Sequence, residues 1–186
     1  MQFNNHWNLD GKHAILSASK YQWIRYTPEK LKEYYANQLR VERGTRLHAF
    51  AAECISLGQK LPRSRKTLNS HVNDAIGFHM QPEVVLRYSD NCFGTADAIS
   101  FNDKKLRIHD LKTGTHPAKF DQLEIYTALF CLEYKYNPKN IDIELRIYQN
   151  DETKIFVPDP EEIQEIMDKI IEFDKIITEM KDSELA

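Results

Sequence analysis

The sequence predicts an α/β protein in which helices flank a mixed β-sheet. Hydrophobic residues follow a helical period over residues 45–57 and again from residue 159 onward. Three short segments between residues 83 and 112 are instead rich in β-branched and aromatic residues and are separated by Asn and Asp. A long helical segment then leads to a strictly alternating strand, residues 141–149, and such a crossover predicts a strand that returns to the same sheet.

The first helix is expected after Thr27 and Pro28, a pair typical of a helix start. A second helix is expected over residues 45–57 and a short third helix over 67–80. The later elements are strands over 83–89, 92–101 and 105–112, a helix over 115–136, strands over 141–149 and 153–157, and a helix from Asp159, where Pro160 and Glu162 form a capping-box start. The first three strands should form a meander, and the fourth should arrive after the helical crossover.

Length and composition indicate one globular domain over residues 1–186. The chain has 186 residues, of which 41% are hydrophobic and 28% charged, enough to bury a core without disulfides. The chain lacks an apolar run of about 18 residues, so we expect no membrane span. The first residues do not resemble a secretory signal, so we expect a cytoplasmic protein with reduced thiols at its three scattered cysteines.

The charge is unevenly distributed along the chain. The net charge is −3. Residues 40–66 contain seven basic and two acidic residues, a net charge of +5, whereas residues 159–186 contain three basic and ten acidic residues, a net charge of −7. A local basic region of this kind can bind phosphate, although composition alone equally allows a solvated charged surface.

Two aspartates and a lysine stand out in the segment "GTADAISFNDKKLRIHDLKTG". The sequence "NDKK" predicts a turn between the second and third strands. A loop of two or four residues places Asp97 directly opposite Asp110 on one face, with Cβ atoms about 4.5–5.5 Å apart. A three-residue loop would send them to opposite faces. Lys112 lies two residues beyond Asp110 and therefore shares its face.

Two carboxylates at that separation repel each other unless a cation lies between them. A divalent ion with oxygen ligands, Mg²⁺ or Mn²⁺, meets this need. Lys112 beside such an ion would hold an attacking water and stabilise negative charge on a phosphate. The alternative is structural: Asp110 and Lys112 form an ion pair, and Asp97 protects an edge strand from aggregation.

The chain contains five short motifs in this order: "LSASKY", "GTRLH", "GTAD", "DLK" after twelve intervening residues, and "QLEIY". In kind and order they resemble the PD-(D/E)XK nuclease superfamily, in its RecB-like, phage-type exonuclease branch, which is related to CRISPR-adaptation nucleases. The resemblance implies a restriction-endonuclease-like core and a metal-dependent deoxyribonuclease, acting as an exonuclease on linear DNA in recombination, repair or phage replication. The alternatives are an endonuclease on the same fold and a catalytically inactive DNA-binding or assembly module.

Carried onto this chain, the resemblance implies a set of site residues. The metal ligands would be His48, Asp97, Asp110 and the backbone carbonyl of Leu111, and the catalytic residues would be Asp97, Asp110 and Lys112. Gln122 and Tyr126 match a Q-x₃-Y motif that contacts DNA or orients the lysine, and they lie on one helical face. Glu83 occupies a place where relatives often carry glutamate, and its role stays open.

Exposed basic residues are expected to follow the DNA backbone with little sequence specificity. They are Arg43, Arg46, Arg63, Arg65 and Lys66. Relatives that carry an iron–sulfur cluster have a Cys-Pro pair after the "LSxS" segment, whereas this chain has Thr27-Pro28, so we expect no cluster. The resemblance further allows a homo-oligomer and a recombinase or single-strand-binding partner, in a bacterial or phage-infected host cell.

Overall fold

The longest helix, α1 (Pro28–Ser56), is continuous where the sequence predicts two helices. The expected break near residue 44 was wrong, because a single glycine inside a helix costs only about 1 kcal/mol relative to alanine and cannot stop it alone. The helix starts as expected: the hydroxyl of Thr27 accepts a hydrogen bond from the N–H of Lys30 at 3.2 Å. At its other end Gly58, with a φ of 65°, turns the chain.

The structure is a computed structural model that describes residues 4–5, 7–9 and 11–184. The chain divides into two compact units, residues 1–45 and 46–186. The first unit contains the short helices η1 (Trp7–Leu9) and η2 (Ala18–Arg25) and the beginning of α1. The prediction of one nuclease domain over the whole chain stays a prediction.

The second unit is built around a five-stranded mixed sheet in the order β1-β2-β3-β4-β5. Its strands are β1 (Gln81–Ser89), β2 (Cys92–Asn102), β3 (Lys105–Leu111), β4 (Asp142–Gln149) and β5 (Glu152–Phe156). Strands β3 and β4 are parallel, and the other neighbours are antiparallel. The predicted meander and the helical crossover before the fourth strand are both confirmed.

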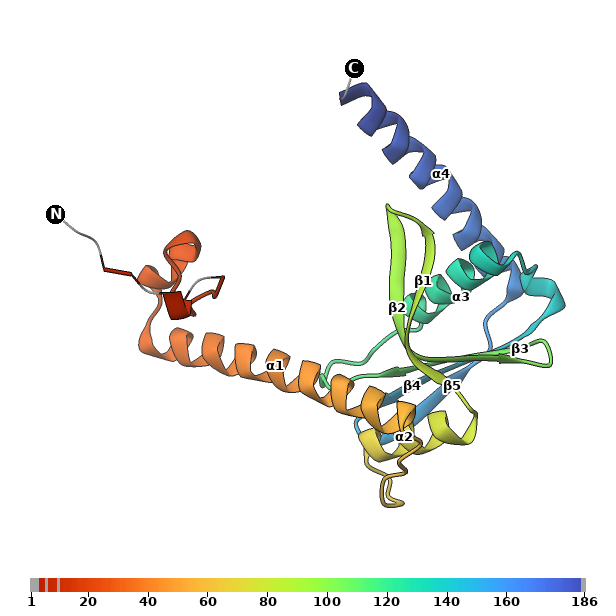
Figure 1. Cartoon of the computed structure of the whole chain (residues 1–186), viewed down its shortest axis with the longest axis horizontal. Coiled ribbons are helices and arrows are strands. Elements are labelled where there is room, and N and C mark those ends of the chain that lie inside the picture. Colours follow the sequence, from red (N-terminus) through yellow and green to blue (C-terminus); the bar gives the residue numbers. More distant parts are fainter. Residues whose placement is uncertain (1–3, 6, 10, 185–186) are drawn as a thin grey trace. The chain divides into compact units, whose positions relative to one another are not determined.

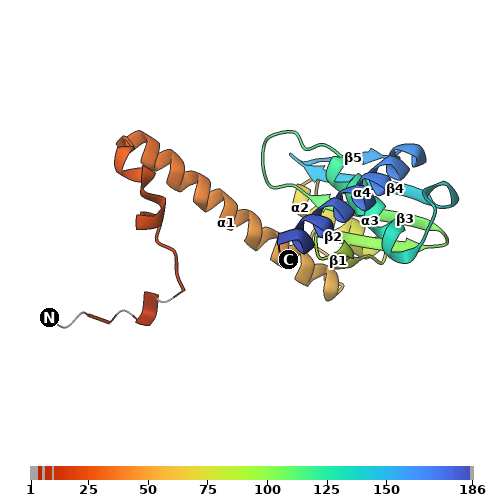
Figure 2. The ribbon, with the colours of Figure 1, turned by 90° about the horizontal axis from the view of Figure 1, so that it is seen from above.

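Helices cover both faces of this sheet (Figure 1). They are α2 (Thr67–Gly77), α3 (Asp121–Tyr134) and α4 (Pro160–Glu184), and the short η3 (Pro138–Asn140) precedes β4. The crossover helix begins at Asp121 rather than near 115; the residue before Pro117 disfavours helical backbone, which excludes a start before residue 117. Figure 2 shows α3 and α4 lying together on one side of the sheet. The predicted α/β class, a mixed sheet flanked by helices, is confirmed.

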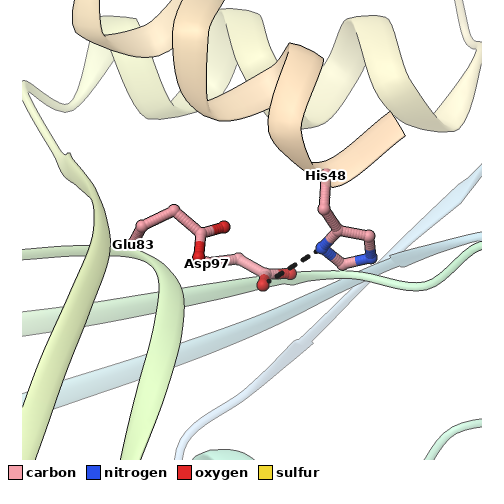
Figure 3. Close-up of side chains that lie close together, drawn as sticks. All are labelled: His48, Glu83 and Asp97. Atoms are coloured by element: carbon pink, nitrogen blue, oxygen red, sulfur yellow. Dashed lines mark hydrogen bonds and ion pairs between the residues drawn. The ribbon is translucent and has the colours of Figure 1, made fainter. Parts of the chain in front are cut away.

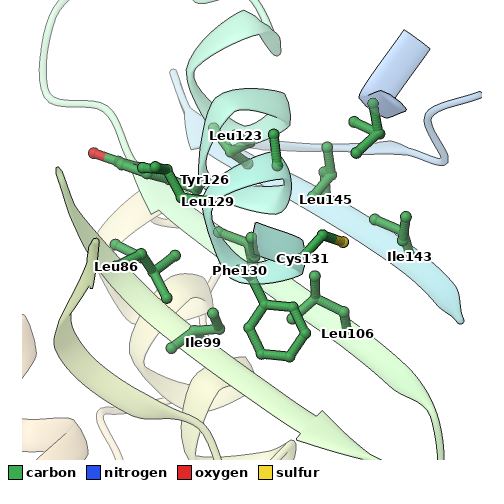
Figure 4. Close-up of a cluster of buried hydrophobic side chains, with 14 of the residues drawn as sticks. Leu86, Ile99, Leu106, Leu123, Tyr126, Leu129, Phe130, Cys131, Ile143 and Leu145 are labelled. Carbon is green, nitrogen blue, oxygen red and sulfur yellow. The ribbon is translucent and has the colours of Figure 1, made fainter. Parts of the chain in front are cut away.

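Each face of the sheet has its own hydrophobic core. Figure 4 shows α3 packed on the strands through side chains such as Leu123, Leu129 and Phe130, which contact Leu86 and Leu106 in one buried cluster. The opposite cluster joins the end of α1 and α2 to the sheet through Ala51, Cys54, Val72, Ala98 and Tyr148. These two cores hold the ends of α1, β2, β3 and α3 in place around one point, where the candidate site lies.

Membrane crossing requires a helix that is both long and strongly apolar. None of the helices in the described part of the chain meets this requirement.

Candidate functional site

The turn between β2 and β3 sets the geometry of the site. Asp103 and Lys104 form a two-residue loop with φ angles of 50° and 61°, the left-handed pair expected of a type I′ hairpin turn. The register therefore pairs Asn102 with Lys105 and continues to Ala98 and His109. Of the two- and four-residue loops that the sequence allows, the structure has the two-residue loop, and the register that both predict is confirmed for these pairs.

Asp97 and Asp110 come next in this register, at the point where the two strands separate. Ala96, on the near side of Asp97, pairs with Val84 of β1, while Asp110 pairs with Ile147 of β4. The ladder between β2 and β3 therefore ends before them, while their outer neighbours stay paired, Ala96 with β1 and Asp110 with β4. The carboxylate of Asp97 uses this opening: its Oδ2 accepts a hydrogen bond of 2.7 Å from the N–H of Leu111.

His48 approaches Asp97 from α1. Its Nδ1 lies 3.2 Å from Oδ1 of Asp97 (Figure 3). This hydrogen bond is the largest influence on the imidazole, and together with the charges of the neighbouring carboxylates it raises the pKa of His48 despite partial burial. Burial acts most strongly on Asp97 and opposes its ionisation, but the hydrogen bonds from His48 and Leu111 outweigh it and hold the pKa of Asp97 below its ordinary value.

Glu83 joins these two residues from β1. The β1–β2 pairs Pro82 with Ala98 and Val84 with Ala96 bracket it, so Glu83 lies beside Asp97 in the register. One potential ligand atom from each of His48, Glu83 and Asp97 lies within 4.8 Å of the other two (Figure 3). Glu83 has a φ of 51°, a strained conformation for a residue other than glycine, asparagine or aspartate, and such strain often collects at functional sites.

The donor set of this His48–Glu83–Asp97 cluster suits a divalent cation. Carboxylates suit Mg²⁺ and Mn²⁺, whereas an imidazole favours a transition metal over Mg²⁺. The pKa of Glu83 is raised, first by partial burial and then by the charge of Asp97, which is the repulsion that a bound cation would relieve. The cluster therefore fits Mn²⁺ better than Mg²⁺.

Asp110 is not part of this cluster of ligand atoms among the described residues, but it lies close enough to be affected by it. Its carboxylate is almost fully buried, and burial is the main reason that its pKa is raised, with the charge of Asp97 as the second. Lys112 opposes this shift: its Nζ lies 3.1 Å from Oδ1 and 3.0 Å from Oδ2 of Asp110. Asp110 Oδ2 is buried without an aligned hydrogen-bond donor in the described chain. A buried carboxylate oxygen in this position is a further potential metal ligand, as the sequence predicts for Asp110.

Lys112 is oriented by two residues of α3. Its Nζ donates a hydrogen bond of 2.7 Å to Oε1 of Gln122, and Nε2 of Gln122 donates one of 2.8 Å to the hydroxyl of Tyr126. These bonds form a continuous chain from Tyr126 to Asp110. The sequence predicts that the Q-x₃-Y pair contacts DNA or orients the lysine. The hydrogen bonds through Gln122 are of the kind that would orient the lysine.

Gly94, the glycine of the "GTAD" motif, makes room for this chain. A Cβ atom at position 94 would lie 2.7 Å from Cε1 of Tyr126, closer than any ordinary contact. The glycine on β2 and the tyrosine on α3 are therefore matched in shape. This coupling was missed at the level of sequence, and the signal for it was the glycine itself, because glycine inside a strand often marks a close approach.

Most of the basic residues predicted to bind DNA lie on the loop between α1 and α2, which is held against α2. Arg63, Arg65 and Lys66 are exposed on this loop, and Arg46 is exposed on α1. The side chain of Asn73 bonds the loop twice, accepting from the N–H of Leu61 and donating to its carbonyl, both at 2.9 Å. Because the loop is held in place, its cations are presented in a defined arrangement. Arg43 is exposed in the other unit of the chain.

A buried aromatic cluster lies behind the site and was not anticipated. His71 of α2 packs edge-on against Tyr148 at 5.2 Å between ring centroids, and the hydroxyl of Tyr148 lies 3.2 Å from Nδ1 of His109. Burial lowers the pKa of His71 to about 4, so this ring is neutral near pH 7. The cluster holds β3 and β4 against α2 and so supports the segment that carries Asp110.

Comparisons with known proteins found no matching protein-family model, no matching curated protein and no matching solved structure. The resemblance to the PD-(D/E)XK nucleases is therefore a hypothesis that rests on the motifs. The geometry defines the class of site: an imidazole and two carboxylates lie beside a buried aspartate that is paired with a partly exposed lysine, on the sheet of an α/β protein.

Proposed function

We propose that this protein is a metal-dependent deoxyribonuclease with a restriction-endonuclease-like core that hydrolyses phosphodiester bonds of linear DNA as an exonuclease. The observation that carries the proposal is the proximity of two groups of residues. Glu83, Asp97 and His48 offer ligands for a divalent cation, and Lys112 is held beside Asp110 by a separate hydrogen-bond chain. An ion site next to an oriented ammonium group is the arrangement that phosphodiester hydrolysis needs.

Metal binding and positioning of the attacking water are assigned to different residues. His48, Glu83 and Asp97 would hold Mn²⁺ or Mg²⁺, with Asp110 and the carbonyl of Leu111 as further ligands. The ion, when bound, polarises the phosphate and makes a water molecule easier to deprotonate. Lys112, paired with Asp110 and aimed by Gln122, would hold the attacking water in line with the scissile bond and offset the charge that builds up on the phosphate.

Substrate binding is assigned to the exposed cations. Arg46, Arg63, Arg65 and Lys66, together with Arg43, would contact the phosphate backbone, so affinity should fall steeply with salt. These contacts carry no sequence information, which suits an exonuclease better than a sequence-specific endonuclease. We place such an enzyme in DNA recombination, repair or phage replication, in the cytoplasm of a bacterial or phage-infected cell. A homo-oligomer, a recombinase or a single-strand-binding protein would be its partner.

The test combines metal binding with cleavage. Calorimetric titration with Mn²⁺ should give one site, and Asp97→Asn and Glu83→Gln should each weaken it about tenfold or more, as loss of a carboxylate ligand requires. Linear DNA carrying a 5′ or a 3′ end label should be shortened only when the metal is present. Asp110→Ala and Lys112→Ala should abolish this activity without unfolding the protein.

A matched control is Glu165→Gln, which neutralises an exposed carboxylate on α4 and should change neither measurement. DNA binding without metal-dependent cleavage would replace the proposal with an inactive DNA-binding module. Cleavage of covalently closed circular DNA would show that the protein is an endonuclease rather than an exonuclease. An undiminished Mn²⁺ site in both carboxylate variants would refute the assignment of the cluster.

A further inference from the structure

The β1–β2 hairpin continues past the His48–Glu83–Asp97 cluster and has two unlike faces. One face packs against α3: Leu86 and Ala96 are fully buried in the same cluster as Leu123. The other face carries Val85 and Phe93, which are 54% and 63% exposed. The helix on that side of the sheet, α2, packs on β3, β4 and β5. Within residues 46–184 the hairpin therefore presents to solvent a strip whose apolar side chains are Val85 and Phe93, with Arg87 directly opposite Phe93.

This strip belongs to the same face as the metal cluster. Alternate residues of a strand share a face, so Phe93 and Thr95 lie on the side from which His48 reaches Asp97, opposite α3. The register places Val85 beside Thr95, and Phe93 next along the same face, where its partner is Arg87. The guanidinium of Arg87 donates a hydrogen bond of 2.8 Å to Asp90. At about 3.3 Å per residue, Phe93 lies roughly 13 Å from Asp97 along the strand.

A nucleic acid that places a phosphate at the cluster must continue over one of the surfaces beside it. A distance of roughly 13 Å corresponds to about four nucleotides at the 3.4 Å spacing of a duplex strand, and to fewer in a stretched single strand. A phenylalanine ring offers no hydrogen bond to a phosphate or to a base edge, but it binds the flat face of a base. In an intact duplex those faces are covered by neighbouring bases, whereas in an unpaired strand they are free.

We infer that Phe93, flanked by Val85, is a stacking site for an unpaired base of the substrate, a few nucleotides from the scissile phosphate. The inference rests on the proposed nuclease function and specifies its substrate: DNA with a single-stranded or frayed end. Stacking of this kind tolerates any base, because every base has a flat face. The strip continues directly from the metal cluster, which favours DNA over a protein as the occupant.

The experiment measures binding without cleavage, in EDTA, using short oligonucleotides that contain 2-aminopurine. Phe93→Ala should weaken binding of the single strand about tenfold, the loss expected for one stacked base, and should remove the quenching of the 2-aminopurine signal. Phe93→Trp should preserve both affinity and quenching. Phe93→Leu, which keeps the apolar surface without a flat ring, should lose the quenching. Blunt duplex should bind all variants with similar affinity.

The matched control is Phe173→Ala, which removes an equally exposed phenylalanine, 56% exposed, from α4 and should change nothing. Unchanged Mn²⁺ binding in Phe93→Ala would show that the fold and the metal cluster are intact. Wild-type affinity in Phe93→Ala, or an equal loss on single strand and blunt duplex, would overturn this inference while leaving the nuclease proposal in place. A wild-type protein that neither binds nor cleaves any DNA would overturn both.

Discussion

Replacing Gly94 with alanine tests the contact between β2 and α3 directly. The new methyl group would lie 2.7 Å from Cε1 of Tyr126, whereas carbon atoms in ordinary contact are about 3.5–4.0 Å apart. The ring of Tyr126 must therefore withdraw by about 1 Å, and because it is only 9% exposed it has to withdraw into packed surroundings. Overpacking of this kind costs about 1–3 kcal/mol of unfolding free energy.

The displacement should reach Lys112 through hydrogen bonds. The bond from Gln122 to the hydroxyl of Tyr126 is 2.8 Å long, so a shift of about 1 Å breaks it and adds about 1 kcal/mol to the loss. Gln122 is then free to rotate away from Nζ of Lys112, which it now holds at 2.7 Å. A misplacement of about 1 Å at a catalytic group can reduce the rate about 10²-fold.

The assay pairs urea unfolding with cleavage of end-labelled linear DNA. Gly94→Ala should lose about 2–4 kcal/mol of stability and about 10²-fold in kcat. Gly94→Ala combined with Tyr126→Ala should lose less stability than the sum of the two single variants, because the clash is gone, but should stay slow. Gly114→Ala, where a Cβ meets nothing within 4 Å, is the matched control. The reasoning is refuted if Gly94→Ala unfolds at the urea concentration of the wild type.

Three further predictions concern stability and binding. Folding lowers the pKa of His71 from 6.5 to about 4, so the neutral ring's contribution to stability is complete above pH 6.5, and about 3 kcal/mol of it is lost as the pH falls toward 4. His71→Phe should make the urea midpoint fall less steeply between these pH values. An unchanged pH dependence of the midpoint would contradict this prediction. Lys104→Gly should raise the melting temperature, because a lysine at a φ of 61° is strained by up to about 1 kcal/mol and glycine is not. A lower melting temperature would argue against the I′ turn. Arg63→Ala with Arg65→Ala should reduce the slope of log K for DNA against log salt by about 1.5, and an unchanged slope would remove these residues from the interface.

Local patterns account for the parts of the fold around the site that were predicted correctly. The two-residue turn and the alternation of β2 and β3 specify their register, since a shift of one residue would expose the side chains that now form the cores. Counted from Asp103 and Lys104, the predicted pair of Asp97 with Asp110 comes just past the last pair of the ladder, Ala98 with His109. The helical crossover before β4 followed from the change of hydrophobic period, and its parallel pairing with β3 agrees with that.

Other parts of the site depended on contacts between distant segments. Glu83 enters the cluster because β1 pairs with β2 in a register whose irregular end at Ser89 cannot be read from the turn "SDNC". His48 reaches Asp97 because the end of α1 is packed on the sheet through Ala51 and Cys54. The length of α1 was also misjudged, since the cost of a single internal glycine is small beside the packing of a long helix.

The β1–β2–β3 meander and the β2–β3 register can be read from the chain, because each depends on neighbours a few residues away. Three features cannot be read from the chain: the grouping of His48 with Glu83 and Asp97, the orientation of Lys112 by Gln122, and the space that Gly94 leaves for Tyr126. They arise when two separate cores press α1 and α3 onto the same sheet. Distances between side chains on different elements are set by that packing, which acts at close range and depends on every residue in the cores.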